Sequence, residues 1–213
     1  LDFKALQAMP LYAAWKAGMA SGTGSKSTAT PTPTAQLLEL TPQETIDSAF
    51  NEINSGLRDQ LLSVVQEMHP SRFEQLIVDL LLAMGYGGGD SSMGERIGKS
   101  GDGGIDGIIN EDALGLDAVY VQAKRYAAEN KIGRPTLQAF VGSLTGEGAS
   151  KGVFVTTSDF SKEAKDYLNK VQHRIVLING DRLARLMIQH EVGVRARKTY
   201  VLRSVDEDYF SDI

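Results

Sequence analysis

Residues 103–124 read GGIDGIINEDALGLDAVYVQAK, and this stretch decides the fold. It holds two apolar runs, GGIDGII over 103–109 and AVYVQAK over 118–124, joined by the turn-rich segment NEDALGLD. Runs rich in Ile and Val that are bounded by Gly, Asn and Asp are typical of strands. The stretch therefore predicts two strands that pair as a β-hairpin.

Polar residues interrupt both runs. Asp106 lies among isoleucines, where a carboxylate is costly to desolvate unless a cationic group meets it. Gln122 and Lys124 end the second run, and the period of two puts them on one face of the strand with Ala123 on the other. We expect the hairpin to bring Asp106, Gln122 and Lys124 together. Carboxylate and amide oxygens suit Mg²⁺, and a neighbouring lysine can activate a water, so the group suits metal-assisted hydrolysis of a phosphodiester.

Two helices are predicted before the hairpin. The segment 41–44 is a capping box with proline at the first helical position, and the apolar spacing after it is interrupted softly at Gly56. A second helix with a wide apolar face begins at Ser71 and stops at Gly85. The apolar positions of the first helix are Ile46, Phe50, Ile53, Leu57, Leu61, Leu62 and Val65.

Strands and helices alternate after the hairpin. The order is a helix from Arg134, a strand over 152–157, a helix capped by Ser161, a strand over 174–178 and a helix after Gly180. Such alternation predicts crossover connections and a partly parallel sheet, hence an α/β fold with a central mixed sheet flanked by helices. Hydroxyls close the strand over 152–157, where they could touch phosphate or prepare the next helix; they belong to Thr156, Thr157 and Ser158.

Composition sets the broad class. The 213 residues carry 22 Lys and Arg against 27 Asp and Glu, a net charge of −5, which argues against an all-over basic nucleic-acid coat. There is no cysteine, which fits a reducing compartment such as the bacterial cytoplasm, and no apolar stretch approaches the about 20 residues that cross a bilayer. We expect residues 1–20 to be the remnant of an upstream segment, 21–40 a flexible linker, and 41–213 one catalytic domain.

Five segments in this order resemble the catalytic domain of the Mrr restriction endonucleases, within the PD-(D/E)xK nuclease superfamily. They are FEQLIVDLLLAMGYGGG, GDGGIDGIINEDALGLDAVYVQAKRY, GRPTLQAFVGSL, GVFVTTSDFSKEA and VLINGDRLARLMI. The resemblance covers the chain from about Thr41 to its end. It implies a restriction-endonuclease-like core and cleavage of DNA with Mg²⁺, for which Mn²⁺ can substitute. It further implies type IV restriction of foreign or methylated DNA.

The resemblance also assigns roles to individual residues. Asp106 matches the family's metal-binding aspartate, Gln122 the residue that replaces the second acid as a metal ligand, and Lys124 the catalytic lysine. Glu74 matches a glutamate of the first core helix that is found near the site in many relatives, although a first-turn glutamate also suits the helix dipole. The family's N-terminal winged-helix domain is not found in this chain, so target selection is left open. Cutting both strands requires two active sites, so a homodimer or larger assembly is expected.

Basic residues beside the hairpin are candidates for DNA binding, namely Arg96, Lys99, Arg125 and Arg134. A second basic group near the C-terminus either lines the DNA or is a solvated end. Two other functions stay open: a Holliday junction resolvase or repair nuclease with the same core, and a catalytically inactive DNA-binding module. A nucleotide-binding α/β protein is disfavoured, because a strand rather than a helix follows the glycine clusters.

Overall fold

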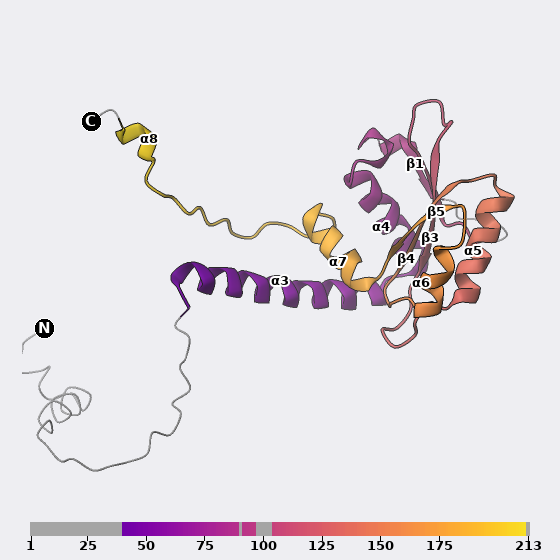
Figure 1. Ribbon diagram of the computed structural model, residues 1–213, viewed down its shortest axis with the longest axis horizontal. Helices are drawn as coiled ribbons and strands as arrows, with labels where there is room; N and C mark the ends of the chain where they lie inside the picture. The colour runs from indigo at the N-terminus through magenta and orange to yellow at the C-terminus, as the bar shows by residue number, and fades with distance from the viewer. Residues whose placement is uncertain (1–39, 90, 97–103, 212–213) are drawn as a thin grey trace, which may run out of the picture. The chain divides into compact units, whose positions relative to one another are not determined.

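The computed structural model of the chain describes residues 40–211 except residue 90 and residues 97–103. Contacts between Cα atoms divide the chain into two units, Leu1–Pro42 and Gln43–Ile213. The expected upstream segment and nearly all of the expected linker lie outside the described residues. The helices and strands of the described chain lie in the second unit, except that the first helix begins one residue earlier, at Pro42 (Figure 1).

A five-stranded sheet forms the centre of this unit, with the strands in chain order from one edge to the other. The strands are β1 (Gly94–Arg96), β2 (Gly107–Asn110), β3 (Ala118–Lys124), β4 (Lys151–Thr156) and β5 (Arg174–Ile178). The first three pair antiparallel and the last three pair parallel, so the predicted mixed sheet is confirmed. The hairpin is confirmed as well, with Ile108 opposite Tyr120. Sequence reasoning missed β1, a short edge strand without an apolar run of its own.

Helices cover both faces of the sheet (Figure 1). They are α3 (Pro42–Glu67), α4 (Pro70–Ala83), α5 (Arg134–Gly146), α6 (Lys162–Leu168) and α7 (Gly180–Gln189). The chain also forms a short exposed helix, α8 (Glu207–Phe210), and two 3₁₀ turns, η1 (Tyr86–Gly89) and η2 (Ser91–Met93). All the predicted helices are present, and none in the described part of the chain is long and apolar enough to span a membrane. Gly56 lies inside α3 without interrupting it, contrary to the predicted soft break.

Two apolar cores sandwich the sheet. One core joins α3, α4 and α7 to the face of β3 that carries Val119, Val121 and Ala123. The other joins α5 and α6 to the opposite face, where Phe140 and Phe154 meet edge to face with ring centroids 5.4 Å apart. Because side chains alternate along a strand, Gln122 and Lys124 share the second face, as the sequence predicts.

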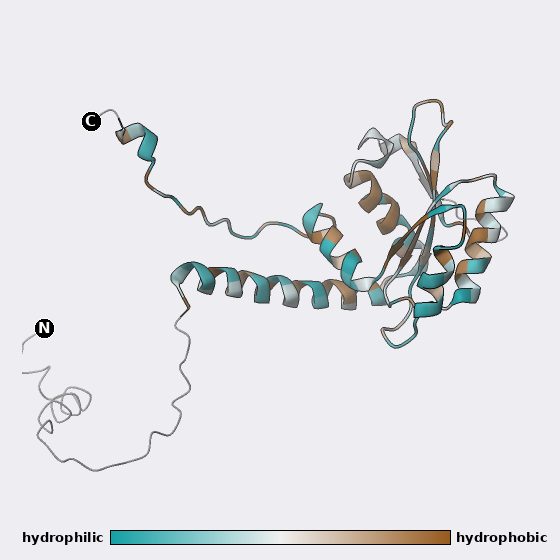
Figure 2. Ribbon diagram, in the orientation of Figure 1, coloured by the Kyte–Doolittle hydropathy of each residue, from teal (hydrophilic) through white to brown (hydrophobic). Residues whose placement is uncertain are grey.

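Helix α3 contributes to the core with only part of its apolar side. Leu61 and Val65 are buried, whereas Ile46, Phe50 and Ile53 remain 47%, 63% and 69% exposed. Figure 2 shows that hydrophobic residues nevertheless recur along the whole helix. The predicted apolar spacing is thus present along α3, but only its C-terminal half, from Leu57 on, packs on the core.

Candidate active site

Asp106 is held at the entrance of β2 by two hydrogen bonds to the neighbouring strand. Its backbone N–H donates to the Val121 carbonyl oxygen at 2.8 Å, and its Oδ2 accepts from the Ala123 N–H at 2.8 Å. The sequence places Asp106 inside a strand, but β2 begins one residue later, at Gly107. These two bonds nevertheless fix the carboxylate beside the end of β3, where Gln122 and Lys124 lie.

The environment of Asp106 raises its pKa above the ordinary value of 3.8. The largest cause is burial, which penalises the charged carboxylate, and the nearby charge of Glu74 acts in the same direction. The Ala123 N–H and the Lys124 ammonium oppose this by favouring the charged form. Asp106 is therefore within electrostatic reach of Glu74 on α4 and of Lys124 on β3, so the structure brings these three predicted residues into one neighbourhood.

Gln122 is buried, with 6% of the residue exposed. Its Oε1 has no hydrogen-bond partner among the described residues, although almost all buried polar atoms in proteins have one. Its Nε2 lies against Gly104, where a Cβ would approach to 2.5 Å. Gly104 also has a φ of +88°, a backbone conformation that favours glycine. Position 104 therefore requires glycine for two reasons: its backbone conformation, and the lack of space for a Cβ beside Gln122.

Lys124 ends β3 in a half-buried position opposite Thr156 of β4. Two residues after Lys124, the backbone of Tyr126 is held by two hydrogen bonds to the Thr157 hydroxyl. This hydroxyl donates to the Tyr126 carbonyl at 2.6 Å and accepts from the Tyr126 N–H at 2.8 Å. This contact is neither of the two roles that the sequence left open for these hydroxyls, contact with phosphate or preparation of the next helix. The contact joins residues 31 positions apart, so no signal in the sequence could have identified it.

The four basic residues expected to bind DNA fall into different settings. Arg125 donates from Nη1 to the carbonyl oxygens of Gln66 and Met68, which lie at the C-terminal end of α3. Arg134 is exposed, with its guanidinium 5.3 Å from the centre of the Tyr167 ring. Lys99 lies outside the described residues, as does the side chain of Arg96, whose backbone ends β1.

Two further observations delimit the site. In the described part of the chain, no three His, Cys, Asp or Glu side chains gather so that they could hold a metal ion. A metal ion beside Asp106 would consequently depend on the amide oxygen of Gln122 as well as on acids. A separate hollow of about 490 Å³, lined by residues 84–88 and Glu111, lies at the opposite end of β2 and contains none of the predicted site residues.

Comparison with known proteins identifies the relatives of this chain. The family model for the restriction endonuclease catalytic domain Mrr_cat matches residues 65–187, more than half of the chain. A curated relative, the type IV methyl-directed restriction enzyme EcoKMrr of Escherichia coli (strain K12), is 45% identical over 175 residues. That match covers 82% of this chain and 56% of the relative, so the chain spans little more than half of the relative's length.

Two solved structures are similar to this chain, and the first supports the fold. The DNA modification-dependent restriction endonuclease AspBHI matches with a TM-score of 0.52 and 20% identity, over 85% of this chain and 45% of that one. The MspJI restriction endonuclease, solved with a 27-mer oligonucleotide, gives a TM-score of 0.49 and 23% identity, over 81% of this chain and 38% of that one. The expected restriction-endonuclease-like core is confirmed. With its hairpin, mixed sheet and matched residues, the chain belongs to the restriction endonuclease family of the Mrr catalytic domain.

Proposed function

We propose that this chain is the catalytic part of a metal-dependent DNA endonuclease that cuts modified DNA. Membership of the Mrr family supports a nuclease, and the 45% identical relative is named as a methyl-directed restriction enzyme. Residues 41–213 would form the catalytic domain. Target selection would depend on parts of a longer protein, because the chain spans only 56% of that relative.

The single observation that carries the proposal is that Oε1 of buried Gln122 has no hydrogen-bond partner in the described part of the chain. A buried carbonyl oxygen without a hydrogen bond is costly unless another group satisfies it. Asp106, bonded to the Ala123 N–H, and Glu74, within electrostatic reach of Asp106, supply carboxylates. Carboxylate and amide oxygens are the ligands that Mg²⁺ and Mn²⁺ prefer. This donor set fits a divalent cation held by Asp106 and Gln122, with Glu74 adding negative charge. When bound, the cation would polarise the phosphate and lower the pKa of a bound water.

The chain's own residues would divide the remaining work. The Ala123 N–H donates to one carboxylate oxygen of Asp106 and so orients this side chain. Because the donor is a backbone group, it holds the carboxylate more rigidly than a flexible side chain would. The Lys124 ammonium would orient the attacking water and stabilise the charge that develops on the phosphate. In the reaction, the water oxygen forms a new bond to phosphorus, one phosphorus–oxygen ester bond breaks, and the departing oxygen takes a proton.

Contacts with DNA would come from cations around this neighbourhood. Arg134 is exposed at the start of α5 and can reach a phosphate without losing a structural contact other than its stacking on Tyr167. Arg96 and Lys99 remain candidates from the sequence. Arg125 would act mainly through α3, because its Nη1 already serves two backbone carbonyls.

Plasmid cleavage tests the proposal. The chain is incubated with supercoiled plasmid in Mg²⁺, in Mn²⁺ and in EDTA, and nicked and linear products are quantified. We expect cutting only with a divalent ion, and a loss of at least about 100-fold in Asp106→Ala and in Lys124→Ala, the size of one lost catalytic group. Binding to an oligonucleotide, measured in EDTA, should change little in Lys124→Ala.

Lys162→Ala serves as the matched control, because Lys162 is an exposed lysine at the start of α6. It should cut like the wild type. Undiminished cutting by Asp106→Ala or Lys124→Ala would contradict the proposal, and so would full activity in EDTA. Parallel assays on methylated plasmid, unmethylated plasmid and a branched junction would separate restriction of modified DNA from resolution of junctions.

A further inference from the structure

The N-terminal half of α3 presents an uncovered apolar face. Ile46, Phe50 and Ile53 recur at steps of four and three residues, and Leu57 continues the series into the core. The three leading side chains are between 47% and 69% exposed. Contiguous exposed apolar side chains at helical spacing mark an interaction surface more often than a solvated one.

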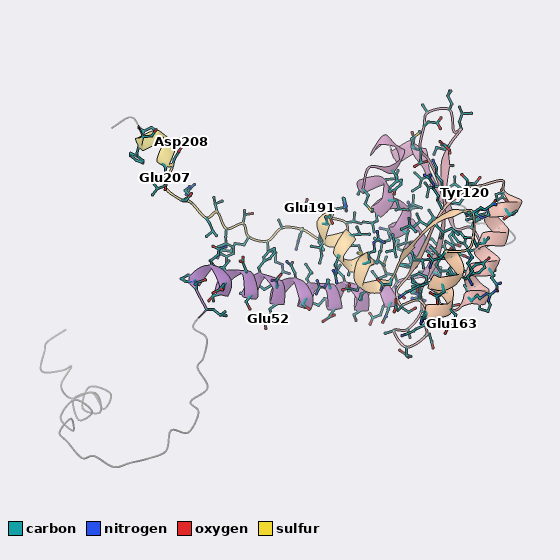
Figure 3. All side chains as sticks on the ribbon, in the orientation of Figure 1. Glu52, Tyr120, Glu163, Glu191, Glu207 and Asp208 are labelled. Atoms are coloured by element: carbon teal, nitrogen blue, oxygen red, sulfur yellow. The ribbon has the colours of Figure 1, made fainter. Side chains whose placement is uncertain are left out.

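The same half of α3 is also acidic. Residues 42–57 contain Glu44, Asp47 and Glu52 and no Lys or Arg, a net charge of −3. Glu52 projects from α3 in Figure 3. A partner for this surface must therefore be apolar and basic, and two copies of the same helix segment would repel each other.

One segment of the described chain has that character. Residues 194–205 read VRARKTYVLRSV and contain four bases, Arg195, Arg197, Lys198 and Arg203, and no acid, a net charge of +4. Its apolar side chains are as uncovered as those of α3: Tyr200 is 76%, Val201 68%, Leu202 63% and Val205 72% exposed. We call residues 194–205 the C-terminal segment.

We propose that the apolar face in the acidic N-terminal half of α3 is the docking site for the C-terminal segment of a second copy of this chain. The contact is reciprocal: each copy offers its segment to the α3 of the other, as a two-fold symmetric interface requires. The apolar residues of the segment cover Ile46, Phe50 and Ile53, and its bases face Asp47 and Glu52.

The two surfaces match in length. From Ile46 to Leu57 the helix rises by about 16 Å at about 1.5 Å per residue. The apolar stretch from Tyr200 to Val205, when extended, covers about 17 Å at about 3.3 Å per residue. An extended segment of this size can thus span the exposed turns of α3 from Ile46 to Ile53, with Tyr200 and Leu202 on the side that faces the helix.

A second copy is favoured over the chain's own segment. The segment begins at Val194, which packs on the same core as Leu57 and Leu62 of α3, so it is tethered close to that helix. In the single chain both surfaces stay uncovered despite this tether. Reciprocal exchange covers both at once and buries two such contacts per pair, which helps to reach the area that stable interfaces need.

The mass in solution tests the interface. Light scattering after gel filtration, in EDTA and without DNA, should give the wild-type chain the mass of two 23.0 kDa chains. Phe50→Glu places a charge in the apolar face of α3, and Leu202→Glu does the same in the C-terminal segment. Each variant should elute with the mass of one chain and keep the far-ultraviolet circular dichroism of the wild type, since both sites are exposed.

Mixing the two variants separates exchange between copies from docking within one chain. Phe50→Glu still has an intact segment, and Leu202→Glu still has an intact α3. A mixed pair therefore regains one good contact, and the mixture should recover a measurable fraction of the mass of two chains. Docking within one chain would give no recovery, because each variant would carry its own defect.

A charge exchange adds a second arm. Asp47→Lys/Glu52→Lys and Arg197→Glu/Lys198→Glu should each weaken the pair, and their mixture should strengthen it. Leu116→Glu is the matched control, because Leu116 is an apolar residue of the hairpin turn that is 83% exposed, and it should leave the mass unchanged.

Several results would overturn the proposal. A wild-type mass of one chain would do so, as would an unchanged mass in Phe50→Glu and Leu202→Glu. If Leu202→Glu kept the mass of two chains but lowered DNA affinity and its salt dependence, the C-terminal segment would instead be a DNA contact. The interface is independent of metal and cleavage, so this outcome and a failure of the proposed nuclease activity are distinguishable.

Discussion

The side-chain amide of Gln122 packs directly against Gly104, where a Cβ would lie only 2.5 Å from Gln122 Nε2. The absence of a side chain at Gly104 is what allows the buried amide of Gln122 to occupy its observed position. The glycine therefore acts on the proposed metal ligand without touching a substrate itself.

Gly104→Ala should lower DNA cleavage by more than tenfold, because the added methyl group displaces the Gln122 amide. The free energy of unfolding should fall by about 1–2 kcal/mol from the left-handed backbone conformation alone. Initial rates at saturating DNA and urea denaturation measure the two effects.

Gly85→Ala is its control, since Gly85 has a φ of +97° and a Cβ there would meet nothing within 4 Å. It should show the same loss of stability with wild-type cleavage. Equal losses of cleavage in both variants would mean that backbone strain, and not displacement of Gln122, explains the effect.

Asp106→Asn should abolish cleavage while raising the free energy of unfolding at neutral pH. Burial raises the pKa of Asp106, so the charged carboxylate is less favourable in the folded state than in the unfolded one. Asparagine keeps an oxygen that can accept from the Ala123 N–H but carries no charge. Urea denaturation of both proteins at neutral pH measures the difference.

The same comparison predicts a pH dependence with a defined sign. The folded-state pKa of Asp106 lies above 3.8. At a pH above that folded-state pKa, the buried charge of Asp106 therefore lowers the free energy of unfolding of the wild type. The cost disappears as the pH falls through the folded-state pKa toward 3.8. The advantage of Asp106→Asn should therefore be full at neutral pH and shrink in acid; an advantage that grows in acid would contradict the assigned cause.

Thr157→Val should slow cleavage and destabilise the fold by about 1–3 kcal/mol, because it leaves the N–H and carbonyl of Tyr126 without their hydroxyl partner. Thr157→Ser keeps the hydroxyl and should restore most of kcat. A purely structural role would lower stability and leave kcat unchanged in both variants. Single-turnover rates at saturating DNA distinguish the two.

Arg125→Ala should destabilise the fold by about 1.5–3 kcal/mol, the range for hydrogen bonds from a charged donor, since its Nη1 serves the carbonyls of Gln66 and Met68. Arg134→Ala should cost no more than about 1 kcal/mol, because it loses only an exposed contact with Tyr167. Urea denaturation compares them. DNA affinity should fall in Arg134→Ala if its proposed phosphate contact exists.

The hairpin and the order of elements could be predicted because their signals are local. The period of two over β3 assigns Gln122 and Lys124 to one face, and Gly, Asn and Asp between the runs predict the turn. Short elements escaped this reasoning. Strand β1 has three residues and forms by pairing with β2, and β2 itself begins after Asp106 because that residue bonds through its side chain as well as its backbone.

The sequence by itself determined the α/β class, the strand–helix order and the identity of Asp106, Gln122 and Lys124 as a candidate group, because periodicity and composition act within single elements. Only the tertiary structure decided that Glu74 lies within electrostatic reach of Asp106 and that Gly104 makes room for Gln122. It also decided that the leading turns of α3 stay exposed, since an apolar spacing predicts a helical face but not what covers it. Contacts between elements depend on packing in three dimensions, which a local pattern does not encode.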